Sequence, residues 1–176
     1  GEQLQSEREG LVELLREPAM ERAPSAERQD ELMYGEMRSS IAYCLGVIGG
    51  AEVTDTLTLM LGDPYPEARY NAATGLARQG DSRSVERLLE TLQIDNEEAV
   101  KYEAEQADQL RRWKQNMVIV NGLRGIKALH DANPTKSLPD EVHDAIRKVQ
   151  DAKVLKGNDA YKFELDEVVR LLSAQG

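Results

Sequence analysis

The feature that most constrains the fold is a duplicated pattern within residues 38–94. Each copy contains two hydrophobic patterns of helical spacing, separated by glycine. A repeat of this length, built from two helices, predicts an all-α helical solenoid. Matching residues lie 31 positions apart, and the pairs are Arg38 and Arg69, Ala42 and Ala73, Leu45 and Leu76, Gly49 and Gly80, Leu57 and Leu88, and Leu61 and Leu92.

Helix stops and starts divide the chain into the units of one solenoid domain, residues 1–176. Gly49-Gly50 and Gly80 mark helix ends, because glycine adopts the left-handed conformation without steric cost. Asp63 and Ser137 are residue types that cap helix starts. We therefore expect about three to four helix pairs. The expected units are an N-terminal capping helix (1–23), repeat 1 (24–62), repeat 2 (63–94), an irregular repeat 3 (95–156) and a C-terminal capping helix (157–176).

Hydrophobic residues at helical spacing predict which side chains form the core. Cys44 follows this pattern and is expected to be a small buried hydrophobic residue. In the first two helices, 4–22 and a helix opened by Pro24-Ser25, the core positions are Leu4, Leu11, Leu14, Leu15, Leu32, Met33, Met37, Ile41, Cys44, Leu45 and Ile48. In the later units they are Ala68, Ala72, Ala73, Leu76, Ala77, Leu88, Leu92, Leu110, Trp113, Met117, Val120, Leu123, Val142, Ile146, Val149, Phe163, Leu165, Val168 and Leu172.

Residues 96–129 depart from the repeat, because no proline or glycine interrupts them before Gly122. They predict one extended helix, roughly 50 Å long at about 1.5 Å per residue. Its first half, residues 97–109, is poor in large hydrophobic residues and is expected to project beyond the stack. Gly122 and Gly125 lie within a helical hydrophobic pattern and are expected to allow close helix packing.

Composition and charge limit the classes of partner. The formal net charge of −10 argues against nucleic acid and against anionic membrane surfaces, since both require clustered lysine and arginine. Apolar runs do not reach the roughly 20 residues that span a bilayer. A single cysteine excludes an internal disulfide. The chain begins with Gly1. We therefore expect that a leader or upstream repeats have been removed, and the compartment stays open between cytoplasmic and exported.

Trp113 is flanked by Arg111, Arg112 and Lys114, a combination that can bind single-stranded nucleic acid. Its spacing from Leu110 and Met117 instead indicates a core position. We also find no nucleophile elbow, phosphate-binding glycine loop or Cys-His metal spacing in the sequence.

The second unit resembles the short HEAT-like repeat of bacterial proteins. Its matching residues are Asp63-Pro64, Ala68-Arg69, Ala72-Ala73, Leu76-Ala77 and Gly80-Asp81. The resemblance implies a right-handed superhelix of antiparallel helix pairs, with first helices on the convex face and second helices on the concave face. It also implies a binding scaffold for a protein or peptide. Some similar proteins are phycobilin lyases, so a bilin-handling protein is the alternative, and a structural module of a larger chain is a further one.

The two histidines are each followed by aspartate, as His130-Asp131 and His143-Asp144. These dipeptides are similar to the His-Glu pairs with which deoxyhypusine hydroxylase, also built of HEAT-like repeats, binds iron. Here aspartate replaces glutamate and the pairs fall across a predicted helix end and loop. We therefore expect surface histidines and no metal or other cofactor.

The sequence thus predicts a scaffold without catalytic activity that binds a protein or peptide. Outer positions of the second helices would form the binding surface. These positions are Asp55, Thr58 and Leu59 in repeat 1, Glu86, Arg87 and Glu90 in repeat 2, and Glu141, Asp144 and Lys148 in repeat 3.

Overall fold

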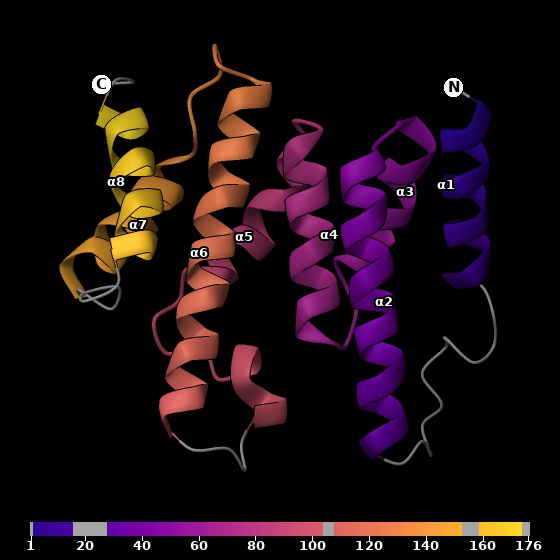
Figure 1. Cartoon of the computed structure of the whole chain (residues 1–176). Helices are drawn as coiled ribbons and strands as arrows, with labels where there is room; N and C mark the ends of the chain where they lie inside the picture. The colour runs from indigo at the N-terminus through magenta and orange to yellow at the C-terminus, as the bar shows by residue number, and fades with distance from the viewer. Residues whose placement is uncertain (1, 16–27, 104–107, 153–158, 174–176) are drawn as a thin grey trace.

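The computed structural model describes residues 2–15, 28–103, 108–152 and 159–173, and all regular elements in these ranges are helical (Figure 1). The α-helices are α1 (Glu2–Leu15), α2 (Arg28–Ile48), α3 (Ala51–Met60), α4 (Pro66–Arg78), α5 (Val85–Thr91), α6 (Asp108–Ala132), α7 (Asp140–Ala152) and α8 (Asp159–Ser173). Two short 3-10 helices are η2 (Ser82–Ser84) and η3 (Glu98–Glu103).

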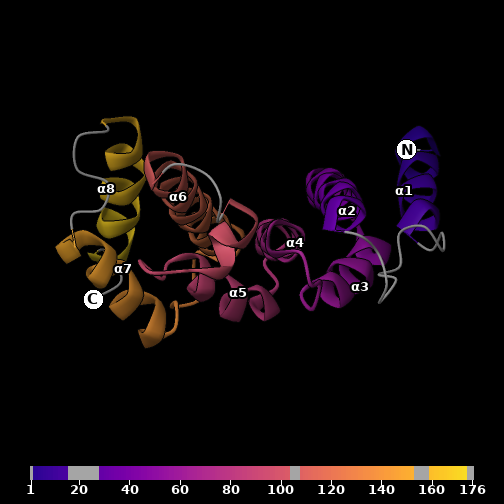
Figure 2. The ribbon, with the colours of Figure 1, turned by 90° about the horizontal axis from the view of Figure 1, so that it is seen from below.

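The helices form two rows. The first helices of the pairs, α2, α4 and α6, lie side by side, and the second helices α3, α5 and α7 form the other row behind them (Figures 1 and 2). Helices α1 and α8 close the two ends of the first row. This arrangement confirms the all-α solenoid. The rows bend so that α4 lies deeper than α2 and α6, which places the hollow side on the first helices. The expectation that second helices line the concave face was therefore wrong.

The predicted helix ends at glycine are confirmed. Gly49 and Gly80 have φ angles of 65° and 75°, in the left-handed region that side chains disfavour. Asp63, however, does not cap α4. Tyr65 occupies that position and Pro66 is the first helical residue, while the Asp63 Oδ1 accepts a hydrogen bond from the Tyr65 backbone N–H at 2.8 Å.

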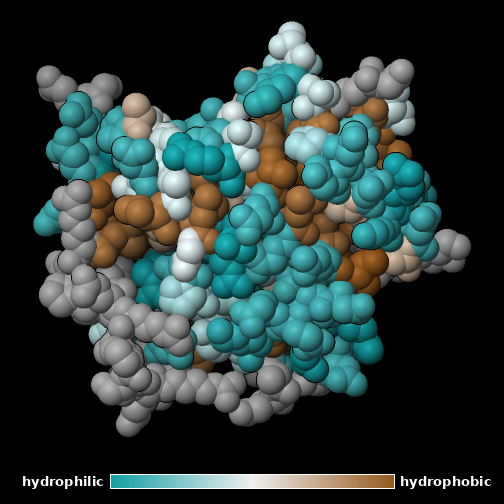
Figure 3. Space-filling view, turned by 180° about the vertical axis from the view of Figure 1, so that it is seen from behind, coloured by the Kyte–Doolittle hydropathy of each residue, from teal (hydrophilic) through white to brown (hydrophobic). Residues whose placement is uncertain are grey.

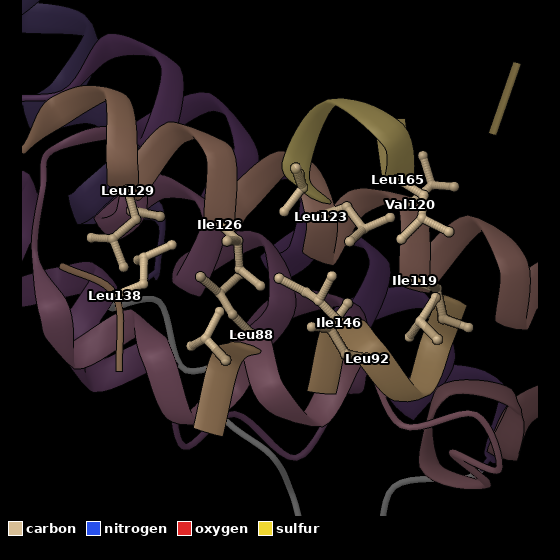
Figure 4. Packing of buried hydrophobic residues seen from close by; sticks show 14 of the residues in the cluster. Leu88, Leu92, Ile119, Val120, Leu123, Ile126, Leu129, Leu138, Ile146 and Leu165 are labelled. Atoms are coloured by element: carbon tan, nitrogen blue, oxygen red, sulfur yellow. The ribbon is translucent and has the colours of Figure 1, made fainter. Parts of the chain in front are cut away.

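The hydrophobic core is divided into clusters along the stack, and Leu61 packs against two of them. Around α2, α3 and α4 it includes Leu45, Leu57 and Leu76, all fully buried. The predicted small residues of α4 are buried as well and let neighbouring helices approach closely. The core then continues through α5, α6 and α7, where Leu88, Leu92, Ile119, Leu123, Ile126 and Ile146 interdigitate (Figure 4).

Glycines set the closest helix approaches, as expected for Gly122 and Gly125. A Cβ at Gly122 would lie 2.0 Å from the Thr91 Oγ1, and one at Gly125 would lie 2.5 Å from a Leu88 methyl carbon. These contacts bring α6 against α5. Helices α2 and α4 meet in the same way at Gly46 and Gly75.

Several predicted core positions are instead exposed. The buried face of helix α2 contains Arg38, Ala42 and Gly46. In this orientation Cys44 lies on the face of α2 that is exposed to solvent. At the start of α6 and on α8, predicted core side chains also extend outward. The core prediction was therefore wrong for Leu4, Met33, Met37, Cys44, Leu110, Trp113 and Phe163.

Residues 96–129 do not form one projecting helix. Residues 98–103 form η3, in which Val100 has φ −124° and ψ 16°, and α6 begins only at Asp108. Ala99 and Val100 are buried, and the Tyr102 ring lies 5.1 Å from that of Tyr65, so this segment folds back onto the stack. Residues 16–27, including the predicted helix start at Pro24-Ser25, and residues 104–107 lie outside the described residues.

Candidate functional site

A groove of about 250 Å³ lies on the hollow side of the molecule. Its lining residues place α4 at the floor and α2 and α6 at the two walls. Figure 2 shows α4 between these two helices. Thr91 of α5 also lines the groove. The lining residues are Ser39, Glu67, Tyr70, Asn71, Thr74, Thr91, Trp113, Lys114, Met117, Val118, Asn121 and Gly122.

The floor is polar, with the uncharged Asn71 and Thr74 beside Glu67, whose carboxylate is paired with Lys114. Asn71 lies one turn from Thr74 on α4, so both side chains face the same side of the helix. The Asn71 Nδ2 donates to the Ser39 backbone oxygen at 3.1 Å and to the Ser39 Oγ at 3.0 Å, which ties the floor to the α2 wall. The Thr74 Oγ donates to the Tyr70 carbonyl at 3.0 Å. The Asn71 carbonyl oxygen keeps acceptor capacity for a ligand.

The α6 wall is largely apolar. Trp113 is 52% exposed, although it lies among the groove residues, and Val118 is buried. Met117 is held by α8, because the Tyr161 hydroxyl donates to its sulfur at 2.7 Å. Asn121 is exposed one turn further along α6. The groove therefore combines amide groups with an accessible aromatic ring.

Lys114 is the cation of the groove, and its charge is compensated. Its ammonium group lies 2.5 Å from Glu67 and 3.4 Å from Glu103. Burial disfavours the charged form, but the hydrogen bonds and charges of these two carboxylates raise the pKa of Lys114. Lys114 stays charged and engaged, so it does not form a free anion site.

A buried polar network supports the floor from below. The Glu90 Oε1 accepts hydrogen bonds from the Arg69 Nη2 and the Tyr70 hydroxyl, both at 2.8 Å. Asn96 donates to the Tyr70 oxygen and to the Glu90 carbonyl, at 3.0 and 2.9 Å. Burial opposes the ionisation of Glu90, yet the bonds from Arg69 and Tyr70 lower its pKa. Because its members bond to one another, this network fixes the position of α4 relative to α5.

The predicted second-helix surface is only partly exposed. Asp55, Glu86 and Leu59 are exposed, with Leu59 at 82%. Thr58 is half-buried and donates to the Thr54 carbonyl at 2.7 Å. The expectation of exposure was wrong for Glu90, which belongs to the buried network.

Arg87 also has a structural role. Its Nε donates to the Leu61 carbonyl at 3.0 Å, and this bond links α5 to the end of α3. Its Nη1 lies 3.0 Å from the Glu90 carboxylate. Arg87 and Glu90 of α5 therefore do not belong to the exposed part of the predicted binding surface.

Three predicted residues do come together, at the edge of a hollow between α5 and α7. Glu141, Asp144 and Lys148 line this hollow of about 330 Å³. Figure 3 shows hydrophobic surface over α5 and α7, bordered by hydrophilic residues. The remaining lining residues are Leu89, Leu92, Gln93, Ile94 and Ala145.

The two histidines lie on different helices, His130 near the end of α6 and His143 on α7. The His130 Nδ1 is 3.5 Å from the Asp131 carboxylate. Across the described ranges, no group of three or more His, Cys, Asp or Glu side chains is placed to hold a metal ion. None of the helices in these ranges is both long and apolar enough to cross a membrane.

The sequence did not predict the groove, because its floor and walls come from three helices and its exposed tryptophan has core spacing. The uncharged Asn71, Thr74 and Asn121 at outer positions of the first helices were the available signal. Comparison with known families shows that residues 30–107 match the model of HEAT repeats. Comparisons with curated proteins and with solved structures gave no match.

Proposed function

Because residues 30–107 make this chain a HEAT-like repeat protein, we propose that it is a non-catalytic scaffold that binds a polypeptide partner in the groove over α4. HEAT repeats commonly mediate protein–protein interaction, and stacked repeats present an extended surface for a partner. The groove over α4, with Trp113 at its edge, is the observation that carries this proposal.

The chemistry of the groove suits a peptide main chain. The Asn121 amide group can both donate and accept, the Asn71 carbonyl oxygen can accept, and a peptide bond offers the complementary groups. Exposed Trp113 supplies a rigid apolar surface for one side chain of the partner, which is the role of tryptophan in many interface centres. The charged lining residues Glu67 and Lys114 are paired with each other, so a bound segment does not desolvate an unpaired charge.

The rigidity of the groove favours binding further. Asn71 is bonded to Ser39, Lys114 to Glu67, and Met117 to Tyr161, so the walls are held in place before a partner arrives. A preorganised surface loses less conformational entropy on binding.

A photo-crosslinking amino acid at Asn121 tests the proposal. The matched control carries the same amino acid at Phe163, which is 62% exposed on α8 and does not line the groove. We expect a protein that crosslinks from position 121 and not from 163. Equal capture from both positions would contradict the groove assignment. A pigment that copurifies with the protein, without any crosslinked polypeptide, would favour the bilin-handling alternative.

A further inference from the structure

The hollow between α5 and α7 has a different chemistry from the groove and lies on the opposite face. The two helices that border it differ in length. Helix α5 has 7 residues and α7 has 13. At about 1.5 Å per residue, α7 extends roughly 9 Å further than α5. The chain leaves α5 after Thr91, and Gln93 and Ile94 then border the hollow beside α7.

The floor of the hollow is aliphatic. Leu92 is buried, while Leu89, Ile94 and Ala145 are half-buried and face the open space. A ligand group that contacts these side chains removes apolar surface from water, which favours binding.

The rim of the hollow is acidic. Glu141 is exposed and makes no ion pair with another described residue. Asp144 lies 3.3 Å from Arg147, but both side chains are about two-thirds exposed, at 65% and 67%, so this pair is weak. Asp95 and Asp140, both exposed, adjoin Ile94 and Glu141 in the sequence. Lys148 is the single base among the lining residues.

An aliphatic floor beneath an acidic rim matches the side chain of arginine, which buries its methylene stem while its charged head stays at the surface. We propose that this hollow is a second docking site, which takes an arginine side chain of a basic polypeptide segment. The stem packs on Leu89, Ile94 and Ala145, and the guanidinium group binds Glu141 and Asp144. The formal net charge of −10 draws such a segment toward the protein.

This inference does not rest on the groove, and its test uses separate residues. The probes are two short alanine-based peptides, acetylated and amidated, that carry either arginine or its neutral isostere citrulline at the same positions. Binding is followed by NMR through the backbone amides of the full chain. We expect the arginine peptide to shift the Gln93, Ile94 and Ala145 amides, and the citrulline peptide to bind at least about tenfold more weakly, or about 1.4 kcal/mol.

Variants separate this site from general attraction between opposite charges. Glu141→Lys with Asp144→Lys should weaken arginine-peptide binding at least about tenfold, while Lys148→Ala should strengthen it. The matched control, Asp55→Lys with Glu86→Lys, changes the net charge equally on α3 and α5. We expect it to alter affinity by less than about threefold. Equal weakening by both pairs, or equal binding of the citrulline peptide, would overturn the proposal.

Discussion

Arg38 and Asp63 form a two-bond ion pair between the first helix of one repeat and the start of the next. The Arg38 Nε and Nη2 donate to the two Asp63 carboxylate oxygens at 2.7 and 3.0 Å, and the side chains are 9% and 8% exposed. Arg69 occupies the equivalent position in the following repeat and pairs with Glu90. The Arg38–Asp63 pair therefore joins repeat 1 to repeat 2, whereas the Arg69–Glu90 pair joins α4 to α5 within repeat 2.

Loss of one partner from this pair should be costly, because the other charge remains buried. We predict that Asp63→Ala lowers the free energy of unfolding by about 3–5 kcal/mol, measured by urea denaturation. The control is Arg147→Ala, which removes the exposed partner of Asp144 and should cost at most about 1 kcal/mol. Similar losses in the two variants would show that burial of the Arg38–Asp63 pair contributes nothing.

The network around Glu90 predicts a pH dependence of stability. The pKa of Glu90 in the folded protein lies below its ordinary value of 4.5. The folded state therefore binds fewer protons than the unfolded state in this range. The contribution of Glu90 to stability is complete above pH 4.5. It is lost as the pH falls from 4.5 through the pKa of Glu90 in the folded protein. Urea midpoints between about pH 7 and pH 3 should decline less steeply in Glu90→Gln than in the wild type. Parallel curves would exclude Glu90 as a source of acid sensitivity.

The contact of α6 with α5 at Gly122 should not tolerate a methyl group. Gly122→Ala is predicted to lower stability by about 1–3 kcal/mol, because its Cβ would overlap Thr91. Gly10→Ala is the matched control in helix α1, where the added Cβ meets no atom within 4 Å. It should leave stability unchanged or raise it by up to about 1 kcal/mol. A melting temperature that is equal in the two variants would contradict the packing at Gly122.

Substitution of a core leucine should reduce stability far more than substitution of a surface leucine. Leu76→Ala removes a fully buried side chain and should cost about 2–5 kcal/mol. Leu59→Ala changes a leucine that is 82% exposed on α3. Its effect should stay within about 0.5 kcal/mol. Calorimetry of both variants checks this difference, and an unchanged melting temperature for Leu76→Ala would refute the repeat alignment.

The sequence was sufficient for the solenoid because its matched positions are core leucines and turn glycines. Leu76 and Gly80 occupy the predicted environments for this reason. Hydrophobic periodicity wrongly predicted that Cys44 is buried. The contact between Gly46 of α2 and Gly75 of α4 determines which face of α2 is buried. A stripe of apolar residues does not reveal which of its edges faces a neighbouring helix.

The groove and η3 depend on tertiary structure and were not predictable from local patterns. Residues 98–103 contain no glycine or proline, yet Ala99 and Val100 are buried against the stack. Glu90 has the spacing of a surface residue, and its burial depends on Arg69, which lies 21 residues earlier. The matching arginines in the duplicated pattern were the signal of these ion pairs.

The most direct test of the scaffold is the fluorescence of Trp113 during titration with the protein captured from position 121. Trp113 is the single tryptophan of the chain, and its indole ring is half exposed in the groove. We predict a saturable shift of its emission to shorter wavelength and protection from acrylamide, because the bound polypeptide covers the ring. Saturable binding that leaves the emission and quenching of Trp113 unchanged would contradict the assignment of the groove as the binding surface.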